Sequence, residues 1–129
     1  SAKQGVAMVN GVNGLVLLPD DWTLPDGAHF TSGFASNGGY EYYKTVNTYT
    51  ASEWTLMEEA GAVFLPAAGY RNGTSVYNVG TGVNYWSSTY SSSSYAYCVS
   101  FYSGNLYPSG NCSRNYGLSV RLCSEISSK

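Results

Sequence analysis

The chain has 129 residues, a net charge of −2 and only 11% charged residues, where a typical domain has roughly 25%. This length suits one domain with one core, so we expect residues 1–129 to form a single domain. The few lysines and arginines form no basic stripe, which argues against nucleic acid as the partner. The sequence contains no run of 18 apolar residues, so we expect no insertion in a membrane.

The first predicted element is a strand over residues 14–18, a short apolar run that Pro19 ends. Residues 20–49 are rich in glycine, asparagine, proline and aromatic residues. They predict long connecting loops, with a short strand or turn near residues 40–43.

A helix follows. Thr50 and Glu53 have the spacing of a capping box, in which each side chain accepts a hydrogen bond from the other residue's backbone N–H. Trp54, Met57 and Ala60 then fall on one apolar face, and Gly61 is a typical residue to end a helix. The spacing predicts a helix of about three turns at most.

Further strands are predicted at residues 62–65, before Pro66, and at residues 85–88, with turns at 72–73 and 80–82 between them. Residues 97–102 alternate with a period of two, which indicates a half-buried strand. Its core face would carry Tyr97, Val99 and Phe101, and its other face Cys98, Ser100 and Tyr102.

A turn is predicted at 103–105, and alternation predicts a closing strand at 118–123, with Leu118, Val120 and Leu122 on one face. Arg121, within this strand, is expected to form a framework ion pair or to donate hydrogen bonds to carbonyl groups. We expect the tryptophans to be core anchors. A helix beside a twisted antiparallel sheet is an α+β domain.

The stretch from Tyr90 to Tyr116 has an unusual composition. Nineteen of its 27 residues are Tyr, Ser, Asn or Cys, and only Arg114 is charged, so a low-complexity polar loop is one interpretation. The interleaved Val99, Phe101 and Leu106 favour strands with a core face instead. Tyrosine gives stiff contact area and Ser, Gly and Asn adapt their hydrogen bonds, as in antibody paratopes. The stretch therefore predicts a binding surface.

The genetic code offers a common origin for these residue types. Replacing adenines in asparagine codons gives codons for tyrosine, serine and cysteine. The whole stretch could therefore descend from an asparagine-rich template that was altered only at adenines.

A frame of residues surrounds and interrupts this stretch, and it consists of residues 85–89, Ala96, Tyr97, Val99, Phe101, Arg114 and residues 117–122. This frame resembles the variable proteins of diversity-generating retroelements. Residues 51–54 and 61–71 resemble the broader group of C-type-lectin-fold domains, which includes relatives of the formylglycine-generating enzyme. The resemblance covers roughly residues 14–123.

The resemblance implies a C-type lectin fold with one or two short helices and long loops. It also implies a diversified surface, exposed on a bacterial cell or a phage particle, that binds a macromolecular target such as a cell-surface protein or glycan. The candidate ligand-binding positions are Tyr90, Ser92, Ser93, Ser94, Tyr95, Cys98, Ser100, Tyr102, Asn105, Tyr107, Ser109, Asn111, Cys112, Ser113, Asn115 and Tyr116.

The three cysteines, Cys98, Cys112 and Cys123, have no CxxC spacing. From the residues alone, one disulfide with a free thiol and three free thiols are both open. The resemblance implies that Cys98 and Cys112 are chance products of diversification with no structural role, and that Cys123 belongs to the framework.

Catalytic residues are hard to find. His29, the only histidine, lies in a predicted loop, so we expect no enzyme and no cofactor. Asp20, Asp21 and Asp26 could supply oxygen to calcium, but aspartates beside prolines more often form turns, so we expect no metal. The alternatives are an oxidase like the formylglycine-generating enzyme, which needs a matched cysteine pair, and a structural tip subunit of a pilus or phage tail.

Overall fold

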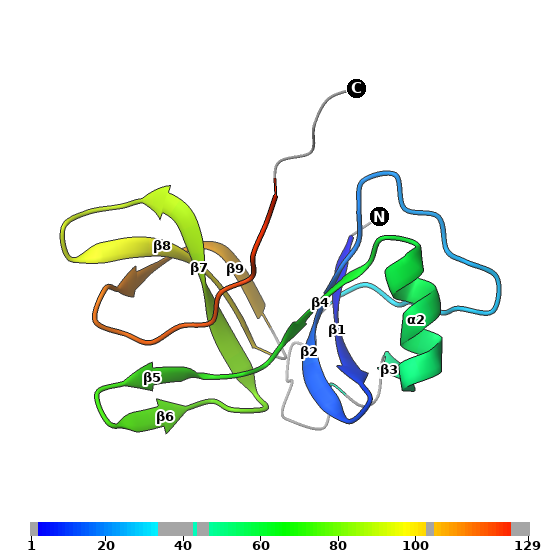
Figure 1. The fold of residues 1–129 in the computed structure, drawn as a ribbon, viewed down its shortest axis with the longest axis horizontal. Helices are drawn as coiled ribbons and strands as arrows, with labels where there is room; N and C mark the ends of the chain where they lie inside the picture. The colour runs from blue at the N-terminus through cyan, green and yellow to red at the C-terminus, as the bar shows by residue number, and fades with distance from the viewer. Residues whose placement is uncertain (1–2, 34–42, 44–46, 103–104, 125–129) are drawn as a thin grey trace.

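A computed structural model describes residues 3–33, 43, 47–102 and 105–124 of the chain. Twisted, mainly antiparallel β-sheets and a short α-helix give it an α+β fold, as predicted (Figure 1). A four-stranded sheet with the helix lies on one side of the molecule in Figure 1. A three-stranded sheet with a separate β-hairpin lies on the other side.

The four-stranded sheet has the order β3-β1-β2-β4, and its strands are β1 (Gln4–Val9), β2 (Val12–Leu17), β3 (Thr48–Tyr49) and β4 (Val63–Pro66). Asn10 and Gly11 both have positive φ, as a two-residue turn between β1 and β2 requires. β2 and β4 confirm the strands predicted around residues 14–18 and 62–65. β1 and β3 were not predicted.

The helix α2 (Ala51–Glu59) begins as the capping box predicts. The backbone N–H of Glu53 donates to Thr50 Oγ1 at 3.2 Å, and that of Thr50 donates to Glu53 Oε2 at 2.7 Å. Trp54 and Met57 are buried, as expected, and Gly61 ends the helix with a φ of 100°. The prediction for Ala60 is wrong: it is exposed, because it is the C-cap and the chain already turns away there.

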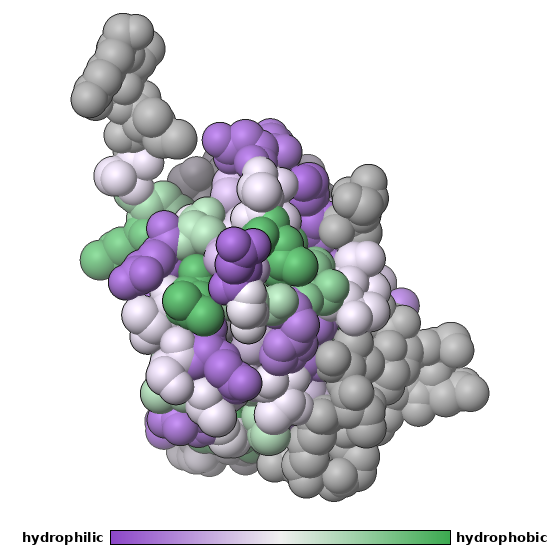
Figure 2. Space-filling view, turned by 90° about the vertical axis from the view of Figure 1, so that its right-hand side faces the viewer, coloured by the Kyte–Doolittle hydropathy of each residue, from purple (hydrophilic) through white to green (hydrophobic). Residues whose placement is uncertain are grey.

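The helix and the loop after β2 cover one face of the four-stranded sheet (Figure 1). Their buried residues form one cluster, which contains Ala7, Val9, Val16, Leu18, Tyr49, Trp54, Met57 and Ala62. Trp22 is only half-buried against this cluster. Figure 2 shows this end of the molecule, where hydrophobic residues lie among hydrophilic ones without a large continuous apolar area.

The three-stranded sheet has the order β7-β8-β9, with β7 (Gly82–Tyr90), β8 (Tyr95–Tyr102) and β9 (Asn105–Ser113). The hairpin of β5 (Tyr70–Asn72) and β6 (Ser75–Tyr77) turns at Gly73, as the predicted turn requires. A second cluster joins the two sheets, and it consists of Val6, Leu15, Tyr43, Leu65, Ala67, Val83, Tyr85 and Phe101. Residues 40–42, part of the predicted short strand or turn, and residues 103–104, part of a predicted turn, lie outside the described residues.

The predicted closing strand is wrong. Residues 118–123 form no strand, and their backbone pairs with the sheets at an isolated bridge between Tyr85 and Ser119. Val120 is exposed and Leu122 is 89% exposed, because no neighbouring strand covers them. Within the described part of the chain Arg121 has no carboxylate partner; its charge lies near Tyr85, where it opposes the rise in pKa that burial causes.

Candidate ligand-binding surface

The two faces of β8 have different surroundings, as the period of two predicts. Phe101 is completely buried in the cluster that joins the sheets, and Tyr97 and Val99 are half-buried. On the opposite face Tyr102 is exposed, Ser100 is half-buried, and Cys98, which we expected at the surface, is buried. The strand therefore holds a core with one face and presents polar side chains with the other.

A hollow of about 320 Å³ lies over this second face. We call it the tyrosine hollow; it is lined by Tyr70, Asn84, Cys98, Ser100, Tyr102, Tyr107, Gly110, Asn111, Cys112 and Tyr116. The composition of the stretch leads us to expect Tyr102, Tyr107 and Tyr116 to be exposed on one surface. All three line this hollow, and Tyr102 and Tyr107 are exposed, but Tyr116 is half-buried.

Tyr70 and Tyr77 extend this aromatic surface. They are cross-strand partners in the β5–β6 hairpin, with ring centroids 5.3 Å apart, and Tyr70 also stacks on Tyr116 at 5.6 Å. Burial by these neighbours, and then the nearby hydroxyl of Tyr102, raise the pKa of Tyr70. We did not predict these two residues, because the turn signal at Asn72-Gly73 would place position 70 opposite position 75, whereas the hairpin turns at residues 73–74 and pairs Tyr70 with Tyr77.

The floor of the hollow contains a disulfide. Cys98 on β8 and Cys112 on β9 are joined with an S–S distance of 2.07 Å, and Cys98 is only 1% exposed. The expectation that these cysteines have no structural role is therefore wrong, because the bridge ties two neighbouring strands together. Cys123, expected in the framework, is instead exposed with a free thiol.

The register of β9 changes beside this bridge. Cys98 lies opposite Gly110 and Ser100 lies opposite Tyr107, so β9 has one residue more than β8 between these pairs. Pro108 lies in this irregular part, where the missing N–H of proline is tolerated. The bulge therefore begins directly after Tyr107 on β9.

Asn84 on β7 brings a buried amide to the hollow. Its side chain is only 8% exposed, and its Oδ1 accepts a hydrogen bond of 2.6 Å from Ser100 Oγ. Among the described residues its Nδ2 has no hydrogen-bond partner. One donor of the hollow is therefore unused by the protein itself.

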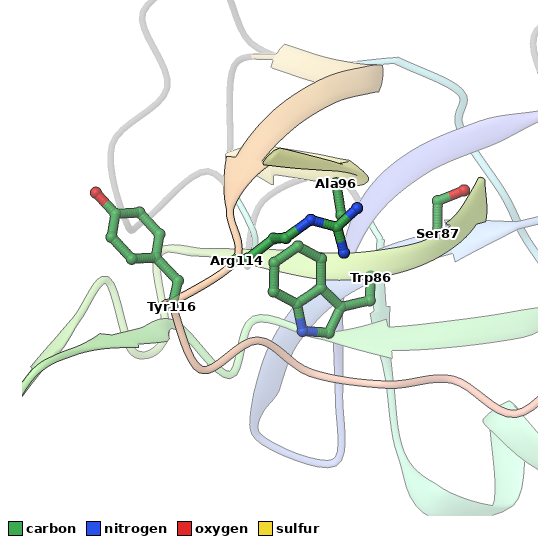
Figure 3. A pocket seen from close by; sticks show the side chains of 5 residues that line it. All are labelled: Trp86, Ser87, Ala96, Arg114 and Tyr116. Atoms are coloured by element: carbon green, nitrogen blue, oxygen red, sulfur yellow. The ribbon is translucent and has the colours of Figure 1, made fainter. Parts of the chain in front are cut away.

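A second hollow of about 320 Å³ is lined by Trp86, Ser87, Ala96, Arg114 and Tyr116, and Figure 3 shows it from close by. Arg114 extends over Trp86, whereas Tyr116 points away from the other four side chains. Arg114 Nε donates to Ser92 O at 2.9 Å, and its guanidinium lies 5.2 Å from the ring centre of Tyr90. Arg114 therefore fixes the turn between β7 and β8, and half-buried Trp86 forms a wall of this hollow.

The structure gathers seven of the sixteen predicted positions around the tyrosine hollow, and these are Cys98, Ser100, Tyr102, Tyr107, Asn111, Cys112 and Tyr116. The others lie at the end of β7, on the turn before β8, at the start of β8, along β9 or after it, and these are Tyr90, Ser92, Ser93, Ser94, Tyr95, Asn105, Ser109, Ser113 and Asn115. Two of these positions bond to each other, since Ser113 Oγ donates to Asn115 Oδ1 at 2.5 Å. Asn111 Oδ1 accepts from Ser91 Oγ, outside the set, at 2.7 Å.

The predicted acidic positions lie elsewhere. Asp20, Asp21 and Asp26 are exposed in the loop after β2, and His29 stacks on Tyr49 with ring centroids 4.7 Å apart. In the described ranges no group of three or more His, Cys, Asp or Glu residues could hold a metal ion. The described residues also contain no helix that is long and apolar enough to span a membrane.

The family model of a domain of unknown function, DUF8237, matches residues 44–123 of the chain. The chain belongs to the DUF8237 family. This DUF8237 match runs from before α2 to beyond β9, so it includes both hollows and every candidate position, whereas β1 and β2 precede it. No curated protein and no solved structure matches the chain.

Proposed function

We propose that this DUF8237 chain is a ligand-binding domain, and that the face of β8 and β9 around the tyrosine hollow contacts its target. One observation carries the proposal. Tyr102, Tyr107 and Tyr116 surround one hollow, on the face of the sheet opposite buried Phe101. Exposed tyrosines on a rigid sheet offer contact area at low entropic cost.

We further propose that the domain is a variable protein of a diversity-generating retroelement. The division between core and surface supports this, since Val83, Tyr85 and Phe101 pack in the core while most candidate positions are exposed. Adenine-directed changes at the exposed codons would alter the contact surface and leave the core intact.

The C-type lectin fold belongs to the same proposal. Twisted antiparallel strands, a short helix between the strands, and long loops support it. The Cys98–Cys112 disulfide supports a position outside the cell, on a bacterial surface or a phage particle, because disulfides persist in oxidising surroundings.

The gene itself tests the retroelement. We expect a reverse-transcriptase gene nearby, and a template repeat that differs from codons 90–116 only at template adenines. Sequencing the locus would show whether the reverse-transcriptase gene and the template repeat are present. Differences spread over all four template bases, or a locus without a repeat, would contradict the retroelement and leave the binding function to be judged separately.

Binding is tested on whole cells with labelled domain. The triple variant Tyr95→Ala, Tyr102→Ala and Tyr107→Ala should lose binding to the cell types that the wild type labels, while its Tm stays within a few degrees, because all three rings are exposed. The matched control is Val12→Ala, Leu24→Ala and Leu56→Ala, which removes exposed apolar groups of the four-stranded-sheet side. Equal binding by both triple variants would contradict the proposed surface.

A further inference from the structure

The tyrosine hollow contains no charged side chain among the residues that line it. Its walls are the rings of four tyrosines, and its remaining polar groups are amides and hydroxyls. Moving an ionic group into such a hollow would strip its water without offering a counter-charge. The hollow is therefore suited to an uncharged ligand.

The polar groups at the base point to a ligand with hydroxyl groups. Asn84 offers its unused Nδ2 as a donor, and Ser100 still has an acceptor site after donating its proton to Asn84 Oδ1. A ligand hydroxyl both accepts and donates a hydrogen bond, so one hydroxyl can satisfy both residues. A hydrocarbon surface would leave the buried amide of Asn84 unpaired, which is costly.

The tyrosine rings favour a ligand that also has a flat apolar face to pack against them. Tyr70 and Tyr116 are stacked at the edge of the hollow, and Tyr102 and Tyr107 line it from β8 and β9. The faces of aromatic rings carry negative charge density, which attracts C–H groups. A pyranose ring has C–H groups on one face and hydroxyls around its edge, and so it matches both the rings and the amide.

The concave shape also favours a small unit over a flat protein surface. The hollow has about 320 Å³, which lies near the lower end of the roughly 300–1,000 Å³ of small-molecule pockets. A stable protein interface needs about 800 Å² from each partner, most of it outside such a hollow.

We propose that the tyrosine hollow binds an uncharged sugar ring at the exposed end of a glycan, an inference that rests on the proposed binding function. Asn84 and Tyr70 lie outside the stretch from Tyr90 to Tyr116, so part of the sugar site belongs to the constant framework. The changing positions around it would then choose among neutral glycans.

The direct test is an NMR titration of the isotope-labelled domain with methyl glycosides of glucose, galactose, mannose and N-acetylglucosamine. At least one glycoside should shift the side-chain amide signals of Asn84, with a Kd on the order of 1 mM for a single ring. The matching uronic acid, which adds a carboxylate, should bind at least tenfold more weakly. No shift with any neutral glycoside would overturn the sugar proposal.

Two variants locate the site. Asn84→Asp keeps the oxygen that accepts from Ser100 and removes the donor, and Tyr107→Ala removes a ring that is 50% exposed and so leaves the core intact. Each should weaken glycoside binding at least tenfold. Leu24→Ala, which removes an exposed side chain outside the stretch and outside the lining of the hollow, should bind like the wild type. Unchanged affinity in the Tyr107→Ala variant would contradict the proposal even if Asn84→Asp fails to fold.

Labelling of cells treated with periodate or with protease distinguishes sugar binding from the more general binding function on which the inference rests. Periodate strong enough to cleave the vicinal diols of neutral sugars, and so to open their rings, should abolish labelling by the wild-type domain, whereas protease treatment that leaves glycolipids and polysaccharides in place should not. Labelling that is lost with protease and survives periodate would indicate a protein target. That result would overturn the sugar and keep the binding function.

Discussion

At the scale of single residues, Tyr49 shows how a buried polar side chain supports the fold. Its ring is 2% exposed, between His29 and Trp54, and its hydroxyl donates to the backbone oxygen of His29 at 2.6 Å. Burial, and then the negative charge of Glu53, raise the pKa of Tyr49 from 10.0 to about 12. The proton is therefore held more tightly in the folded state than in the unfolded state.

This shift predicts a loss of stability in alkali. Below pH 10 Tyr49 is protonated in both states and its contribution is complete; between pH 10 and about 12 the unfolded state loses the proton first, so unfolding becomes easier. Urea unfolding across this range should show a falling free energy, with a flatter decline in Tyr49→Phe. Tyr95→Phe, which changes an exposed ring, serves as the control. A decline as steep in Tyr49→Phe as in the wild type would contradict the assignment.

At the scale of elements, α2 depends on its first turn. The helix is short, with nine residues, and only Trp54 and Met57 are buried. Short helices gain little from propensity alone, so the two hydrogen bonds between Thr50 and Glu53 contribute a substantial part of its stability.

Thr50→Ala should therefore lower the free energy of unfolding by about 1 kcal/mol, because it removes the cap hydroxyl. Thr55→Ala is the matched control: Thr55 Oγ1 donates to Ala51 O on the exposed side of the same helix and caps nothing. Chemical unfolding curves measure both variants. Equal losses from the two substitutions would mean that the capping box contributes little.

At the scale of the whole molecule, the two sheets share one core cluster. Val6, Leu15 and Leu65 come from the four-stranded sheet, and Val83 and Phe101 come from the three-stranded sheet. Neither sheet can lose its partner without exposing these side chains to water. We therefore expect the two sheets to unfold together.

Tryptophan fluorescence tests this expectation because Trp54 lies beside one sheet and Trp86 lies within the other. In a Trp22→Phe background, variants that keep only Trp54 or only Trp86 should report the same denaturation midpoint. Phe101→Leu should lower the free energy of unfolding by about 1 kcal/mol, and both midpoints should shift by the same amount. Two separated transitions would show that the sheets unfold independently.

Local signals in the sequence predicted much of the fold. The capping box gave the start of α2, apolar runs before prolines gave β2 and β4, and alternation gave the faces of β8. β1 was missed because Gly5 and Ala7 weaken its apolar pattern, although both are buried. The alternation at residues 118–123 misled us, because alternation alone does not show whether a neighbouring strand is present to pair with.

The site was only partly predictable, for a similar reason. Composition identified Tyr102, Tyr107 and Tyr116, which lie within one unusual stretch. Tyr70 and Asn84 reach the same hollow from β5 and β7, and only the tertiary pairing of strands brings them there. The pairing of Cys98 with Cys112 likewise depends on the register of β8 and β9.

That bridge gives the domain a dependence on where it is made. In a reducing cytosol the same polypeptide would keep two buried thiols at positions 98 and 112, and it would differ from the disulfide-bonded form only by two hydrogen atoms. Closing this 14-residue separation removes freedom from the unfolded chain, by about 3 kcal/mol for a loop of that size. Material purified from the two compartments should therefore be treated as two preparations, and binding should be compared only between samples whose thiol content has been counted.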